Sequence, residues 1–185
     1  MSGQLTLDQA MTQLLRGNER FVAGRPDHPH QSAQRRRAVS RSGQQPFAII
    51  LSCADSRVPP EIIFDQGLGD LFVIRVAGNV LDDIILGTIE YAVEHMHVPL
   101  IMVLGHDQCG AVTAAVKGVE VRNHIQSLAE ALRPAVEIAR TQEGDLISNT
   151  IDVNVQQAIL TLRASEPVLI GACAAGQLAH RRGAL

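Results

Sequence analysis

The chain has 185 residues, of which 46% are hydrophobic and 3% aromatic, and its formal net charge is −3. The length suits one core, so we expect a single domain with an N-terminal helical arm and loop over 1–45 and an α/β core over 46–185. The acidic balance and the scarcity of aromatic side chains exclude a phosphate-tracking or base-stacking surface, and no nucleic-acid partner is expected.

The sequence predicts a protein that neither enters a membrane nor is exported. No apolar stretch reaches the roughly 18 residues needed to span a bilayer, and Met1-Ser2-Gly3-Gln4 lacks the basic and apolar regions of an export signal. Three cysteines without paired spacing do not form a disulfide framework. We therefore expect reduced thiols, a cytoplasmic location and no membrane partner.

The N-terminal arm begins with a predicted helix. Thr6 and Gln9 form a capping box, apolar residues recur at helical spacing over 7–22, and Gly24 suits a left-handed C-terminal cap. Residues 25–43 contain Pro, His and Gln and predict a loop with at most one short surface helix, whose arginines form a solvated face.

Apolar runs alternate with helical patterns along the rest of the chain. We predict strands over 47–51, 71–76, 99–104 and 167–173. Helices are predicted over 58–64, 81–95, 111–116, 123–142 and 153–162, and Pro134 should kink or divide the fourth of these. Continuous apolar strands are typical of a parallel sheet, so the pattern predicts an α/β fold with a mainly parallel central sheet flanked by helices.

Two polar stretches each follow a predicted strand. They are Cys53-Ala54-Asp55-Ser56-Arg57 and Gly105-His106-Asp107-Gln108-Cys109-Gly110. Because ligands collect at the carboxyl ends of parallel strands, we expect the two stretches to meet. Cys53, His106 and Cys109 then offer two thiolates and an imidazole, a set that suits Zn²⁺ and leaves one tetrahedral position open. The third thiol, Cys173, ends an apolar run and is expected to be a small buried residue.

Asp55 has two competing roles in this hypothesis. It is the candidate fourth ligand of a closed site, or it pairs with Arg57 and leaves the metal a water whose pKa falls toward neutrality. Two thiolates donate more charge than imidazoles, so activity should be favoured at mildly alkaline pH. Plainer interpretations are a buried core Cys53 and a surface ion pair. A nucleophilic Cys53 with His106 as its base is the catalytic alternative, but it leaves Cys109 without a role.

These residues resemble the β-class carbonic anhydrases, whose hallmark is Cys-x-Asp-x-Arg followed by His-x-x-Cys. The similarity runs from about Leu14 to Gly171 and includes the segments 17–21, 44–46, 64–72, 75–79 and 89–93. It implies a zinc lyase (carbonate dehydratase) used in carbon utilization, which hydrates CO2 reversibly to bicarbonate and a proton by zinc-bound hydroxide. It implies one zinc per chain on Cys53, His106 and Cys109, and a catalytic dyad of Asp55 and Arg57.

The same resemblance implies substrate contacts and an assembly. Gln44 matches an amide donor to CO2 or bicarbonate, Phe72 and Tyr91 match pocket residues that shape a dimer-interface cleft in the plant-like branch, and Gly110 joins this substrate-binding set. A homodimer or larger even homo-oligomer is expected. Ile50 stands where some members carry a Trp of a regulatory bicarbonate site, so bicarbonate inhibition is not expected.

The end of the chain departs from the family pattern. After the strand predicted over 167–173 it reads Ala174-Ala175-Gly176 and continues to Leu185, so the C-terminal edge segment is expected to be altered or shortened. Two alternatives to CO2 hydration stay open. The first follows from the altered C-terminal segment, and the second follows because the same metal site can act on molecules similar to CO2. One is a zinc-binding relative with little activity, and the other is a hydrolase of a CO2 analogue such as carbonyl sulfide or carbon disulfide.

Overall fold

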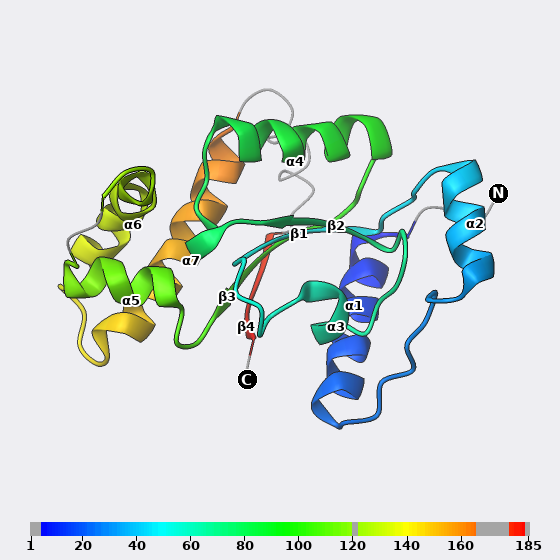
Figure 1. Cartoon of the computed structure of the whole chain (residues 1–185), viewed down its shortest axis with the longest axis horizontal. Coiled ribbons are helices and arrows are strands. Elements are labelled where there is room, and N and C mark those ends of the chain that lie inside the picture. Colours follow the sequence, from blue (N-terminus) through cyan, green and yellow to red (C-terminus); the bar gives the residue numbers. More distant parts are fainter. Residues whose placement is uncertain (1–4, 120–121, 166–177, 184–185) are drawn as a thin grey trace.

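A computed structural model describes residues 5–119 and 122–165 and the backbone of 178–183. In this part of the chain a parallel sheet forms the centre, with β1 (Ala48–Ser52), β2 (Leu71–Arg75), β3 (Ile101–His106) and β4 (Leu178–Gly183). The strand order is β2-β1-β3-β4, and every neighbouring pair is parallel (Figure 1). The predicted α/β fold is confirmed.

Helices cover both faces of the sheet. Side chains alternate between the faces along each strand, so Ile50 joins one apolar core and its neighbours Ile49 and Leu51 join the other. The first core is covered by α1 (Leu7–Val22), α3 (Pro60–Ile63) and α5 (Gly110–Lys117). The second is covered by α4 (Asp83–Met96) and α7 (Leu146–Ala164), and α6 (Ile125–Ala139) packs against α5 and α7. In Figure 1, α4 lies on the side of the sheet opposite α1 and α3.

Several helices and strands begin or end at residues other than those predicted. β3 ends at His106, two residues later than predicted, so His106 belongs to the strand itself. α7 begins seven residues earlier than predicted because Asp145 caps it, accepting a hydrogen bond from the Ser148 N–H at 2.8 Å. Pro134 does not divide α6. Proline removes a single helical hydrogen bond, and buried residues on either side of it keep the helix packed.

The C-terminal part of the chain is described only over β4. The strand predicted over 167–173, with Cys173, lies outside the described residues. β4 comprises Leu178–Gly183 and pairs along β3, with Leu178 opposite Ile101 and Gly183 opposite His106. The sequence pattern gave no signal for this strand because 178–183 contains no apolar run, and an edge strand is paired on one side only.

The structure confirms the helices predicted for the N-terminal arm, the first of which begins with the predicted capping box. The Thr6 N–H donates to Gln9 Oε1 at 2.8 Å, and the Gln9 N–H donates to Thr6 Oγ1 at 3.3 Å, at the start of α1. The loop helix is α2 (Ala33–Ser42), which buries none of its residues. Gly24 is left-handed, with φ of 64°, one residue beyond the C-terminal cap Ala23. Among the described helices, none is both long and apolar enough to cross a membrane.

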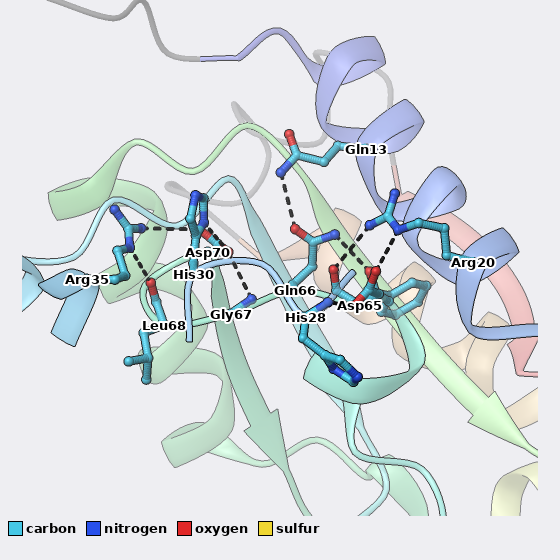
Figure 2. Close-up of polar contacts among 11 residues, drawn as sticks. Gln13, Arg20, His28, His30, Arg35, Asp65, Gln66, Gly67, Leu68 and Asp70 are labelled. Carbon is cyan, nitrogen blue, oxygen red and sulfur yellow. Dashed lines mark hydrogen bonds and ion pairs between the residues drawn. The ribbon is translucent and has the colours of Figure 1, made fainter. Parts of the chain in front are cut away.

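The arm is attached to the core through Asp65, a carboxylate that is only 3% exposed. Asp65 accepts hydrogen bonds from Arg20 Nε at 2.6 Å and from the His28 backbone N–H at 2.9 Å (Figure 2). It also accepts one from the Asp27 backbone N–H at 2.9 Å. These three donors come from α1 and the loop after it. One buried carboxylate therefore satisfies donors that span the end of the helix and the turn that follows.

A second buried carboxylate, Asp70, holds the remainder of the arm. Its oxygens lie 2.8 Å from His30 Nδ1 and 3.2 Å from Arg35 Nη2, and Arg35 Nε also donates to the Leu68 carbonyl at 2.8 Å (Figure 2). The Gly67 N–H donates to Asp70 as well. The segment between α3 and β2 thus provides the anchors for both the loop and α2.

Candidate metal centre

The two polar stretches meet where the strand order reverses. The chain crosses the sheet in one direction from β1 to β2 and in the opposite direction from β2 to β3, so β1 and β3 are neighbours at the kind of switch point where open α/β sheets bind ligands. Cys53 follows β1, His106 ends β3, and Cys109 is the N-terminal cap of α5. Their candidate ligand atoms lie within 4.8 Å of one another, and all three residues are buried. The predicted meeting is confirmed.

The geometry of the three side chains fits a tetrahedral metal. The Sγ atoms of Cys53 and Cys109 are 3.9 Å apart, and two sulfurs bound to one zinc at about 2.3 Å in a tetrahedral arrangement are separated by about 3.8 Å. His106 Nδ1 lies 2.9 Å from the Asp107 carbonyl, which fixes the ring. His106 Nε2 is buried and has no hydrogen-bond partner in the described residues, so a metal would satisfy an otherwise costly orphaned atom.

The two thiols affect each other's ionisation. A hydrogen bond with the Cys109 thiol lowers the pKa of Cys53 to about 4 against the opposing effect of burial, and the Gly78 N–H contributes in the same direction. The same interaction, together with burial, raises the pKa of Cys109. The pair therefore releases its first proton readily and holds the second. A metal ion that binds both sulfurs must displace that second proton.

Asp55 and Arg57 form a two-pronged ion pair beside the cluster. Arg57 Nε donates to Asp55 Oδ1 at 2.9 Å and Arg57 Nη2 to Oδ2 at 2.8 Å, while the Arg57 backbone N–H donates to Oδ1 at 3.0 Å. These hydrogen bonds hold the pKa of Asp55 well below its usual range. Arg57 Nη2 also donates to the Gln108 carbonyl at 3.0 Å, which ties the pair to the second polar stretch. Of the two predicted arrangements, the structure has Asp55 paired with Arg57.

Two residues for which the sequence pattern predicts no role, Arg75 and Gly78, form hydrogen bonds with the stretch Cys53 to Arg57. Arg75 donates from Nε to the Cys53 carbonyl at 3.0 Å and from Nη2 to the Asp55 carbonyl. The Gly78 N–H donates to Cys53 Sγ at 3.3 Å. Gly78 has φ of 72°, and a Cβ there would lie 3.2 Å from Leu132, so the position requires glycine. Both residues belong to the segment 75–79, which resembles the family. That resemblance is the sequence signal that points to a role for them.

The predicted substrate residues are mostly distant from this cluster within one chain. Gln44 is exposed and precedes the amino end of β1, whereas Cys53 follows the carboxyl end. Phe72 pairs with Ile49 in the sheet and packs into the second core. Tyr91 lies on α4 and is 51% exposed. Gly110, the first residue of α5, is the member of the set that lies beside a candidate ligand.

Comparison with known proteins identifies the family. A sequence model described as "Carbonic anhydrase" matches residues 48–181. The chain belongs to the carbonic anhydrase family. It is 45% identical over 170 residues to carbonic anhydrase 2 of Mycobacterium tuberculosis, a match that covers 90% of this chain and 82% of that protein. It is 40% identical over 164 residues to the carbonic anhydrase of Mycolicibacterium smegmatis, covering 86% and 79%.

Solved structures place the fold in the β-class. The β-carbonic anhydrase CcaA superposes with a TM-score of 0.68 at 26% identity, and the match covers 93% of this chain and 88% of that one. A tetrameric β-carbonic anhydrase of the filamentous ascomycete Sordaria macrospora gives a TM-score of 0.69 at 25% identity, covering 89% and 85%. The resemblance to the β-class carbonic anhydrases is confirmed.

Proposed function

We propose that this protein is a zinc-dependent carbonic anhydrase that catalyses the reversible hydration of CO2 to bicarbonate and a proton. Membership of the family supports the carbonate dehydratase activity. The observation that carries the zinc dependence is the buried cluster of Cys53, His106 and Cys109, with its sulfur separation of 3.9 Å and an imidazole nitrogen that has no hydrogen-bond partner among the described residues. These three residues would hold one zinc ion per chain.

The catalytic roles follow from the chemistry of the donors. When bound, zinc supplies a Lewis acid that makes water a nucleophile near neutral pH. Arg57 keeps Asp55 ionised and holds both of its oxygens by hydrogen bonds at 2.8 and 2.9 Å. The remaining lone pairs of that carboxylate can accept a hydrogen bond from the attacking water and direct its reactive lone pair at the carbon of CO2. Because hydrogen bonds from Arg57 hold the pKa of Asp55 well below its usual range, Asp55 acts in this proposal as an ionised hydrogen-bond acceptor.

The substrate contacts proposed for Gln44, Phe72 and Tyr91 need a second copy of the chain. Gln44 precedes β1 and Cys53 follows it, so the two lie at opposite ends of one strand, and Tyr91 is half exposed on α4. A homodimer, or a larger even homo-oligomer, could supply these side chains to a neighbouring centre, while Gly110 acts in its own chain. The tetrameric Sordaria relative supports an oligomer. A cytoplasmic location stays a prediction, based on the reduced thiols expected from the sequence.

Stopped-flow CO2 hydration and zinc analysis test the proposal. Cys53→Ala and His106→Ala should lose both zinc and turnover, whereas Asp55→Ala should retain zinc and lose most turnover. Fully active Asp55→Ala would refute the role of the dyad. Zinc binding without turnover in the parent chain would favour the inactive relative. Parallel assays with carbonyl sulfide and carbon disulfide separate the hydrolase alternative.

A further inference from the structure

Helix α7 packs so closely on β3, beside the metal centre, that a side chain at position 105 would collide with it. A Cβ added at Gly105 would lie 2.8 Å from Val155 Cγ2 and 3.1 Å from Ile151 Cγ2. Gly105 is the residue before His106 in β3. The absence of a side chain there lets α7 pack directly on the strand that carries the imidazole.

This approach brings one polar side chain of α7 to the loop that touches Cys53. Asn154 follows Ile151 by three residues, a spacing that places the two side chains on one face of α7. It is 7% exposed, and its Nδ2 donates to the Gly78 carbonyl at 2.8 Å. Gly78 and Asn154 are 76 residues apart in sequence, so the contact depends on the tertiary packing of α7.

The turn at Gly78 has an unfavourable backbone conformation, so hydrogen bonds from outside the turn help to stabilise it. Gly78 and Asn79 have φ values of 72° and 42°, both in the left-handed region, and the second costs about 1 kcal/mol for a residue other than glycine. Within the turn, the Asn79 N–H donates to the Val76 carbonyl at 2.9 Å. The Asn154 amide adds a hydrogen bond from outside the turn. The N–H of the same Gly78 donates to Cys53 Sγ at 3.3 Å.

We propose that Asn154 is a positioning residue of the metal centre. By holding the Gly78 carbonyl, Asn154 keeps the Gly78 N–H directed at the Cys53 sulfur, where it stabilises the thiolate. This inference rests on the proposed function, in which Cys53 is a zinc ligand. Loss of a hydrogen bond that orients a ligand typically weakens metal affinity 10- to 100-fold. The Asn154 contact is one step further from the metal, so we expect a loss of about 10-fold.

Two variants and a matched control test the role. Asn154→Leu keeps a similar volume without a donor, and Asn154→Asp keeps the shape and has no donor in its ionised form. Asn149→Leu is the control, because Asn149 also lies on α7 and its Nδ2 donates to the Glu143 carbonyl at 3.0 Å, outside the metal centre. Each variant loses one amide-to-carbonyl hydrogen bond of the same helix.

Two readouts are taken on the purified full chains. Zinc dissociation constants come from competition with a chromophoric chelator, and the thiolate-to-metal charge-transfer band is recorded after Co²⁺ substitution. We expect both Asn154 variants to bind zinc about 10-fold more weakly and to move the band to longer wavelength, because a thiolate that loses a hydrogen bond gives up charge more easily. Asn149→Leu should match the parent in both.

Each outcome decides the proposal. Parent-like zinc affinity and an unshifted band in the Asn154 variants would overturn the positioning role and leave the proposed function intact. Failure of the parent chain to bind zinc would overturn the proposed function and this inference with it. If Asn154→Leu does not fold, the same two measurements on Asn154→Asp decide the matter.

Discussion

The contact between α1 and the segment after α3 leaves no room for a side chain at Gly17. A Cβ there would lie 1.8 Å from the Phe64 carbonyl oxygen and 2.7 Å from its carbon. Both are backbone atoms, so α1 must retreat by about 1.6 Å to bring the 1.8 Å distance to ordinary van der Waals contact. That movement stretches the hydrogen bonds from Asn18 to the Ile63 carbonyl, now 3.1 Å, and from Arg20 to Asp65, now 2.6 Å.

The steric clash and the stretched hydrogen bonds destabilise the Gly17→Ala variant by more than the higher helix propensity of Ala stabilises it. In a helix interior Ala is favoured over Gly by about 1 kcal/mol. Overpacking costs about 1–3 kcal/mol, and weakening two hydrogen bonds, one of them to a buried carboxylate, adds about 2 kcal/mol. We therefore expect Gly17→Ala to lower the free energy of unfolding by about 3 kcal/mol.

Urea unfolding at a fixed protein concentration measures this change. Gly87→Ala is the control, since Gly87 also lies inside a helix and a Cβ there meets nothing within 4 Å in the described residues. Gly87→Ala should gain about 0.5–1 kcal/mol. If Gly17→Ala proved as stable as Gly87→Ala, the close packing of the arm would be refuted.

Two further predictions concern carboxylates. Burial raises the pKa of Asp65, but the Asp27 N–H and the Arg20 guanidinium outweigh it and lower that pKa below the 3.8 of an unperturbed Asp. The stability that Asp65 contributes is therefore fully present above about pH 3.8 and is lost as the pH falls through the lower native pKa. Asp65→Asn should cost about 2 kcal/mol near pH 7, and its deficit against the parent in urea unfolding should shrink below pH 4; a deficit that does not change with pH would contradict the assignment. Arg57→Gln should keep its zinc and reduce CO2 hydration by about 10-fold or more, because Asp55 loses the paired hydrogen bonds that orient it, and an unchanged rate would exclude that role.

The candidate ligands could be predicted from sequence because each lies in a short motif after an apolar run. Parallel strands all end at one edge of the sheet, so the sequence alone predicts that Cys53 lies near the pair His106 and Cys109. The pairing of Asp55 with Arg57 was one of two predicted arrangements. Sequence spacing could not choose between them, because both the metal and the guanidinium lie within reach of a residue two positions away.

Asn154 could not be predicted, because its position depends on tertiary packing. A single amide in a helical pattern carries no periodic signal, and its contact with Gly78 requires α7 to approach β3 at Gly105. The predicted start of α7 is too late because the polar residues 148–150 interrupt the apolar spacing in the first turns after the cap at Asp145.

Reversible removal of the metal tests the central claim most directly. The purified protein is analysed for zinc and assayed by stopped-flow CO2 hydration at neutral and mildly alkaline pH, before chelation, after chelation and after zinc is added back. The proposed function predicts about one zinc per chain, turnover that disappears with the metal, and recovery when zinc returns. Metal-free protein that hydrates CO2 at the full rate would contradict it.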